Sequence, residues 1–244
     1  MAFAHLYPWQ LITKTAKIGL SVQLPMPQKV APQLLREETE RIIASFAPAE
    51  QYGSHHAGGW KTIGLVSCGG DPYEDRPLDG PYRKTPALKM SPILEALIDS
   101  FKCDKERVRL SKLEPGNNIL WHDDPDLDNN RLARLHIPVI TNDKVEFQLS
   151  HEDMRWKTGE LWYADFSFPH RVYNGGSEAR IHLMIDLVVN DWVRSLFPSE
   201  FRAGGQARIR VKALCSKVYN AYYLAQALKL SRSKRLRLKK EKMK

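Results

Sequence analysis

The sequence predicts a mainly β fold, an antiparallel sandwich or barrel, with helices on both sides of it. Between Arg107 and Asp191 the chain is a series of short apolar segments. Turn signals separate them, namely PG at 115–116, ND at 142–143 and GG at 175–176. Short strands at this spacing are typical of an antiparallel sandwich or barrel. Helical periodicity occurs before and after this region.

The N-terminal flank, residues 1–105, is expected to contain two helices and a strand. Residues 28–46 repeat apolar side chains at helical spacing and have a proline suited to the first turn. Residues 91–101 begin with a serine N-cap followed by a proline, which indicates the second helix. We expect a strand at 59–67. Residues 68–86 are dense in Gly, Pro and Asp, and we expect a long loop that covers a pocket.

Seven strands are expected in the core, which covers about residues 106–191. In chain order they are RVRLSKLEP, NNILW, ARLHIPVI, VEFQLS, ELWYADFS, HRVYN and ARIHLMIDLVV. With 244 residues and 43% apolar residues, the chain can bury a substantial core. We therefore expect one domain over residues 1–202, made of this core and the N-terminal flank.

Residues 203–244 form a basic C-terminal extension that we expect to be helical. They hold 13 of the 37 Lys and Arg residues and one acid, Glu241, so that the rest of the chain is close to neutral. Apolar residues recur at helical spacing from Val211 to Leu228. Three interpretations stay open: a solvated end, a helix packed on the barrel or on a second copy, and a binding segment for an acidic partner.

Composition also bears on location. No run of 18 apolar residues occurs, so we expect no membrane span. The start MAFAHLYPWQLITK lacks the features of a signal peptide. The three cysteines, Cys68, Cys103 and Cys215, are odd in number and far apart, which favours reduced thiols and a cytoplasmic protein.

Three residues suggest a metal site: His122, Asp124 and His170. Two imidazoles and one carboxylate suit one face of iron(II), with the other positions left open. On an extended segment, residues i and i+2 point the same way, so His122 and Asp124 can converge while Asp123 points elsewhere. His-x-Asp alone is a weak signal, and a solvated turn is the alternative.

The position of Arg180 strengthens the metal interpretation. It follows His170 by ten residues across the turn YNGGSEA, and we expect a hairpin to bring it back near His170. A buried arginine in an apolar strand needs an anionic partner, which a dicarboxylate co-substrate would supply.

Four segments in order now resemble a known family. SKLEPGNNILWH, R-L-H at 134–136, GELWYADFSFPH and the His170-to-Arg180 spacing resemble the aspartyl/asparaginyl β-hydroxylases, over roughly Glu106 to Asp191. Members are oxygenases that depend on iron(II), 2-oxoglutarate and O2. The resemblance implies a double-stranded β-helix (jelly-roll, cupin-like) core with flanking α-helices at both ends. It assigns metal binding to the two histidines above, and 2-oxoglutarate binding to Ser111, Arg134, His136 and Arg180.

Asp124 distinguishes branches of this family. The animal protein-modifying members use two histidines without the carboxylate, whereas His-x-Asp looks more like the bacterial proline cis-hydroxylase branch, which acts on free amino acids. A halogenase would have a small residue at this position. The resemblance therefore implies hydroxylation of an aliphatic carbon of an amino acid, free or within a peptide (Asp-, Asn- or Pro-like), with release of succinate and CO2.

Several alternatives stay open. Desaturation is one, and a non-catalytic cupin-like module that recruits an acidic partner through residues 203–244 is another. Ser111 and His136 can be ordinary core residues, His182 can be structural, and Arg134 can pair with an acid such as Asp128. Substrate contacts are sought at Trp60, Arg83 and Arg155. The sequence leaves the amino acid, the carbon attacked, the stereochemistry and the oligomeric state open.

Overall fold

Two antiparallel sheets face each other in the computed structural model, which describes residues 6–51, 55–124, 127 and 131–241, the last twelve of these as backbone only. Among these residues, eight strands form the larger sheet, in the order β1-β10-β7-β12-β5-β3-β2 with β4 beside β3. Their bounds are β1 (Ser21–Leu24), β2 (Ala49–Glu50), β3 (Trp60–Cys68), β4 (Tyr82–Lys84), β5 (Lys105–Leu113), β7 (Leu132–Ile140), β10 (Leu161–Ala164) and β12 (Arg180–Val188).

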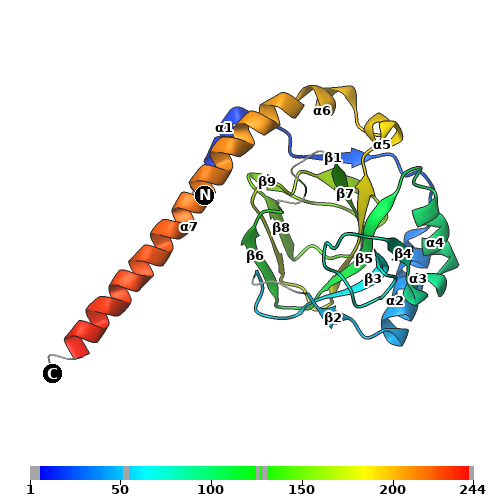
Figure 1. Cartoon of the computed structure of the whole chain (residues 1–244), viewed down its shortest axis with the longest axis horizontal. Coiled ribbons are helices and arrows are strands. Elements are labelled where there is room, and N and C mark those ends of the chain that lie inside the picture. Colours follow the sequence, from blue (N-terminus) through cyan, green and yellow to red (C-terminus); the bar gives the residue numbers. More distant parts are fainter. Residues whose placement is uncertain (1–5, 52–54, 125–126, 128–130, 242–244) are drawn as a thin grey trace.

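The smaller sheet closes the other side of the barrel. Its order within the described chain is β6-β11-β8-β9. The bounds are β6 (Asn118–His122), β8 (Val145–Leu149), β9 (Glu152–Asp153) and β11 (His170–Asn174). Figure 1 shows the two sheets enclosing an interior between them. The predicted double-stranded β-helix with helices at both ends is confirmed.

Helices cover the outside of the larger sheet. They are α2 (Pro32–Ser45), α3 (Pro86–Lys89) and α4 (Pro92–Asp99). Their apolar side chains, including Leu35, Leu88 and Leu97, are fully buried in one core with the sheet. The predictions for 28–46 and 91–101 are confirmed to within a few residues, because proline and a serine N-cap mark the starts: the Ser91 hydroxyl accepts a hydrogen bond from the Leu94 amide at 3.3 Å.

Two local predictions were wrong. The expected loop 68–86 contains β4, which pairs with β3. The expected hairpin between His170 and Arg180 is absent, because β11 belongs to the smaller sheet and β12 to the larger one. The connection crosses between the sheets instead, and so the two residues face the same interior from opposite walls.

Asn174 stabilises that crossing. Its side chain is fully buried, and its amide nitrogen donates to the carbonyls of Leu113 at 3.0 Å and Glu178 at 2.8 Å. Its amide oxygen accepts from the Gly176 backbone N–H at 3.2 Å. One side chain thus joins the end of β5 to the turn that starts β12.

The C-terminal helix packs against the N-terminal one. α7 (Gly205–Glu241) follows α5 (Asp191–Ser195) and α6 (Ser199–Ala203), and it runs beside α1 (Pro8–Ala16) before extending away from the barrel (Figure 1). The Trp9 ring of α1 lies 5.0 Å from the Tyr219 ring, and the Tyr219 hydroxyl donates to the Trp121 carbonyl at 2.7 Å. The first part of α7 is therefore held by the barrel. In the described part of the chain, no helix is long and apolar enough to cross a membrane.

Candidate active site

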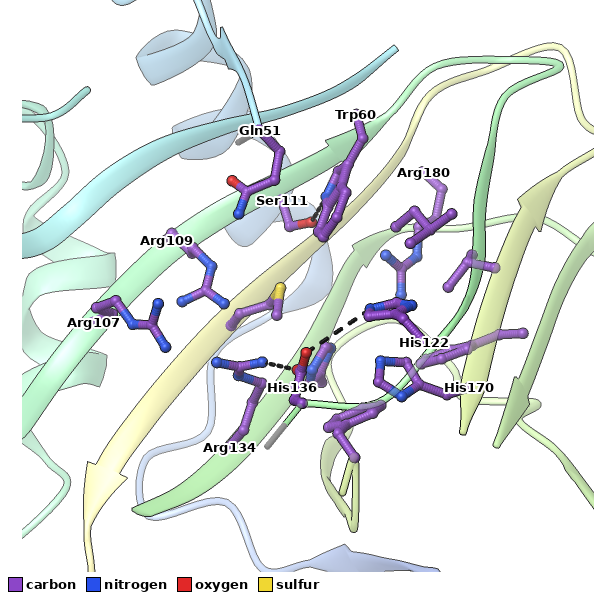
Figure 2. Close-up of a pocket in the computed structure, with 16 residues that line it drawn as sticks. Gln51, Trp60, Arg107, Arg109, Ser111, His122, Arg134, His136, His170 and Arg180 are labelled. Carbon is purple, nitrogen blue, oxygen red and sulfur yellow. Dashed lines mark hydrogen bonds and ion pairs between the residues drawn. The ribbon is translucent and has the colours of Figure 1, made fainter. Parts of the chain in front are cut away.

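A cavity lies between the two sheets. Side chains from both walls line it, and they are unusually rich in arginine and histidine (Figure 2). Because these groups are charged or polar and mostly buried, the cavity is built to hold polar ligands rather than apolar ones.

Three side chains that could hold a metal ion converge at one wall of this cavity. His122 ends β6, His170 begins β11, and the two are paired across the smaller sheet. Asp124 follows His122 by two residues, and one ligand atom from each of the three residues lies within 4.8 Å of the others. The sequence-predicted trio is therefore brought together.

Backbone carbonyls orient both imidazoles. The Nδ1 of His122 donates to the Leu120 carbonyl at 2.8 Å, and the Nδ1 of His170 donates to the Phe168 carbonyl at 3.1 Å. This leaves Nε2 of each ring for a ligand, the arrangement usual in metal-binding histidines. Burial, reinforced by His122, lowers the pKa of His170 to about 3, so the ring is neutral and able to bind a metal at pH 7.

The carboxylate of Asp124 is held ionised. Burial alone would raise its pKa, but the Arg134 guanidinium and the nearby histidines hold that pKa below its ordinary value. An Arg134 Nη1–H donates to Asp124 Oδ2, and the Asp124 backbone N–H donates to the Phe166 carbonyl at 2.9 Å. Two neutral imidazoles and one ionised carboxylate are the donor set that iron(II) takes in non-haem oxygenases. The residues present thus fit this metal.

Arg180, the first residue of β12, also lines the cavity. Its side chain is 2% exposed, and in the described residues its only polar contact is Nη2 with His182 Nδ1 at 2.9 Å. Its Nε has no hydrogen-bond partner among the residues that the structure describes, and burial lowers the pKa of Arg180 to about 9. A buried cation without an acidic partner is unfavourable by roughly several kcal/mol unless a ligand supplies the opposite charge. The site therefore fits an anion.

The same cavity is lined by Ser111, Trp60 and His136. The Trp60 indole N–H donates to the Ser111 hydroxyl at 2.9 Å. The His136 Nδ1 lies 3.3 Å from His182 Nδ1, while its buried Nε2 has no partner in the described residues. Burial holds the pKa of His136 well below its usual range, so the ring is neutral. An unpaired polar atom on a buried ring is suited to contact a polar ligand.

Arg134 pairs with an acid that the sequence did not suggest. Asp128 lies outside the described residues. Asp186 on β12, fully buried, accepts from Arg134 Nε at 2.6 Å and Nη2 at 2.9 Å. The third nitrogen of Arg134, Nη1, donates to Asp124, and so Arg134 directly contacts one of the three residues that could hold a metal.

The cavity is also lined by Arg107, Arg109 and Gln51, which were not predicted from the sequence. The signal was present for the two arginines. They alternate with apolar residues in RVRLS and share a strand face with Ser111, so the period of two places all three on the inner wall.

Arg83 and Arg155 do not line this cavity. Arg83 is exposed on β4, at the edge of the larger sheet. Arg155 is exposed between buried Met154 and Trp156 and borders a separate groove.

Comparisons with known proteins agree with this geometry. The family model for aspartyl/asparaginyl β-hydroxylase matches residues 31–189. The L-proline cis-4-hydroxylase of Rhizobium meliloti (strain 1021) is 27% identical over 163 residues, which is 65% of this chain and 56% of that protein. The aspartyl/asparaginyl β-hydroxylases of Mus musculus and Homo sapiens are each 27% identical over 118 residues, or 48% of this chain and 15% of theirs.

Solved structures also resemble this chain, at lower similarity. A Pseudomonas putida prolyl-4-hydroxylase has a TM-score of 0.45 and 11% identity, covering 75% of this chain and 99% of that one. A 2OG-Fe(II) oxygenase family oxidoreductase from Burkholderia pseudomallei has a TM-score of 0.45 and 12% identity, covering 74% and 88%.

The chain spans about half the length of the bacterial curated relative and a small part of the mammalian ones. The family match nevertheless covers most of the chain, including the smaller sheet, the larger sheet apart from β1, and every candidate metal ligand. The chain therefore belongs to the aspartyl/asparaginyl β-hydroxylase family, and with it to the iron(II)- and 2-oxoglutarate-dependent oxygenases.

Proposed function

We propose that this protein hydroxylates an aliphatic carbon of an amino acid, free or within a peptide, using iron(II), 2-oxoglutarate and O2. One observation carries the proposal: the three metal-binding groups share a buried cavity with Arg180, a cation that has no acidic partner in the described residues. A metal centre and a carboxylate-binding group in one cavity are what this co-substrate requires.

His122, Asp124 and His170 would hold the iron. When bound together with 2-oxoglutarate, iron(II) supplies the chemistry that hydroxylates an unactivated C–H bond, with release of succinate and CO2. The protein contributes the orientation of its own groups. Carbonyl contacts orient the two imidazoles, and Arg134 keeps the Asp124 carboxylate ionised and in place.

Arg180 would pair with the distal carboxylate of 2-oxoglutarate. Its side chain is buried and lines the cavity, and so this pair would be stronger than on a surface. Ser111 and His136, which lie on the same inner wall, would make the remaining polar contacts to the co-substrate. Arg134 contacts Asp124 and Asp186, and we propose that it acts on the co-substrate from this position at the metal.

The substrate is proposed to be an amino acid because the carboxylate-containing trio is the feature that resembles the proline cis-hydroxylase branch. The relative from Rhizobium meliloti carries that name. Trp60, which lines the cavity and is fixed by its bond to Ser111, is the proposed wall against which the substrate lies.

The test begins with purified protein under anaerobic conditions. Wild-type protein should bind iron(II) and 2-oxoglutarate, and on admission of O2 it should form succinate slowly without added substrate. His170→Ala should abolish turnover, and Arg180→Ala should raise the KM for 2-oxoglutarate strongly. The twenty amino acids and short peptides are then screened for faster turnover. Their products are screened for a mass gain of about 16 Da, the mass of one inserted oxygen atom.

The alternative is a module that binds without catalysis. Failure to bind either iron(II) or 2-oxoglutarate would contradict the oxygenase proposal. It would favour the cupin-like binding module that recruits an acidic partner through residues 203–244.

A further inference from the structure

The second half of α7 is a basic helix that projects from the barrel. Seven of the twelve residues from 229 to 240 are Lys or Arg, and none is acidic. Residues 229–240 are called the basic segment below. Figure 1 shows α7 extending away from the barrel on the side where β6 and β8 lie. The proposed function gives this segment no role.

The basic positions of this segment are distributed around the helix axis. Because an α-helix has 3.6 residues per turn, the seven positions cover every side of the helix, and Leu230, Leu236 and Leu238 do not share one side. A helix that lies on a lipid surface has one apolar face and one basic face. This pattern therefore favours a partner whose negative charges reach several sides of the helix, as the phosphates of a nucleic acid can.

A groove lies at the base of the projecting helix, between α7 and the smaller sheet. Arg171 lines it, whereas His170, the preceding residue, lines the active-site cavity, and so the groove lies on the outer face of that sheet. Tyr173 and Tyr223 are 36% and 40% exposed, so part of each ring is accessible to a ligand. Five aromatic side chains line the groove: Tyr7, Trp121, Tyr173, Tyr219 and Tyr223.

The charges in the groove are compatible with a phosphate. The Arg171 guanidinium lies 5.6 Å from the centre of the Trp121 ring and is partly exposed. Among the described residues that line the groove, Glu146 is the one acid, and its carboxylate lies 3.3 Å from Arg171 Nη2. The charge of Glu146 is thus balanced inside the groove, and the neighbouring basic segment makes this surface positive overall.

The groove and the basic segment are continuous along α7. Tyr223 lies six residues before Lys229, which is about 9 Å along a helix. One extended ligand can therefore contact both. Proteins that bind single-stranded nucleic acid combine a positively charged track for phosphates with aromatic rings on which bases stack. An acidic peptide would match the charge, but it has no row of bases to stack on the rings.

We propose that the groove and the basic segment together bind a single-stranded nucleic acid. Bases stack on Tyr173 and Tyr223, and phosphates contact Arg171 and the cations of the basic segment. The strand is RNA or DNA, since both offer the same phosphates and base faces. This role is separate from the metal site and goes beyond the proposed function.

The test measures binding of labelled oligouridylate and oligothymidylate, each of about 15 nucleotides, by fluorescence anisotropy. Iron(II) and 2-oxoglutarate are omitted, so that the result does not depend on the proposed function. The full chain should bind at least one of the two, with an affinity that falls steeply as the salt concentration rises, and the tighter-bound strand identifies the source. Ending the chain after Leu228 should reduce the affinity by at least about 10-fold and flatten the salt dependence.

Tyr173→Leu tests the stacking surface. It keeps an apolar side chain at an exposed position of β11 but removes the ring, and it should weaken binding by about 5-fold or more, the effect of losing one stacked base. Tyr173→Phe keeps the ring and should bind like the wild type. Tyr73→Leu makes the same change at an exposed tyrosine outside the groove and is the control.

Three results would overturn this inference. The first is a full chain that binds neither oligonucleotide at about 0.1 M salt, and binding to phosphatidylserine vesicles in that case would assign the basic segment to membranes. The second is displacement of the oligonucleotide by polyglutamate as effectively as by unlabelled oligonucleotide of equal charge, which would assign the segment to acidic peptides. The third is a Tyr173→Leu variant that binds like the wild type, which would exclude the groove from the site.

Discussion

At the scale of single residues, a substitution of Asp124 can distinguish a direct role in metal binding from an effect of the overall charge. It contributes a carboxylate oxygen to the metal group, whereas its neighbour Asp123 does not. Asp124→Asn keeps the size of the side chain and removes the charge. We expect the affinity for manganese(II) to fall by at least about 10-fold, as it does when groups around metal sites are altered.

Asp123→Asn is the matched control for that prediction, because it makes the same chemical change one residue away. Equal losses in the two variants, measured by calorimetry, would show that Asp124 acts only through the overall charge of the loop.

Asp186 is the residue on which the arginines depend. Asp186→Asn leaves the buried Arg107, Arg109 and Arg134 without their shared carboxylate. Breaking a buried ion pair by removing one partner costs about 3–5 kcal/mol. We expect urea unfolding to show a loss of this size, and Asp191→Asn, an exposed aspartate at the start of α5, to show little change.

The pH dependence of stability tests the same residue. Burial would raise the pKa of Asp186, but the three arginines hold it far below its ordinary value. The folded pKa is thus lowered, and its contribution to stability is present above the unfolded pKa of about 3.9 and is lost as the pH falls below that value. The free energy of unfolding of wild-type protein should fall more steeply below about pH 4 than that of Asp186→Asn, and parallel curves would contradict the assignment.

Individual residues also show which parts of the candidate site could be predicted from the sequence. His122 and Asp124 were predictable because a period of two follows from an extended backbone. The same rule would have placed Arg109 beside Ser111. Asp186 was not predictable as the partner of Arg134, because 52 residues separate them and only the sheet register brings them together.

At the scale of elements, the helix starts were predictable and the strand partners were not. Proline and a serine N-cap are local signals, so α2 and α4 could be found within a few residues. The pairing of β11 and β12 depends on which sheet each strand joins, and a turn-rich segment fits a hairpin and a crossing between sheets equally well. The buried side chain of Asn174 favours the crossing, and no local pattern indicates that burial.

Asn174 therefore supports a prediction about this crossing. Asn174→Ala leaves the carbonyls of Leu113 and Glu178 without their donor, which costs about 1–3 kcal/mol for each group that stays unsatisfied. Because Arg180 follows this turn, we also expect a higher KM for 2-oxoglutarate. Asn118→Ala, at an exposed position of β6, is the control, and a stability loss without any change in KM would limit Asn174 to a structural role.

At the scale of the whole molecule, α7 has two parts with different roles. Its first part buries Cys215 and packs Tyr219 and Tyr222 around Trp9, which is fully buried. Further along, Leu224 and Leu228 are 63% and 62% exposed. The helical periodicity of the sequence predicted both the helix and one of its possible contacts. It could not show that α1 provides the contact surface, because Trp9 and Cys215 are 206 residues apart in the sequence.

Two truncations separate these parts. Ending the chain after Phe201 exposes Trp9 and removes the bond from Tyr219 to the Trp121 carbonyl, so we expect a loss of about 3 kcal/mol or more in the free energy of unfolding. Ending it after Leu228 removes nine of the 13 basic residues of the extension and leaves these contacts intact. Its thermal midpoint and its turnover of free amino acids should match those of the full chain. Loss of turnover on acidic peptides alone would assign the basic end to recruitment, whereas a stability loss equal to that of the shorter chain would contradict the division of α7 into two parts.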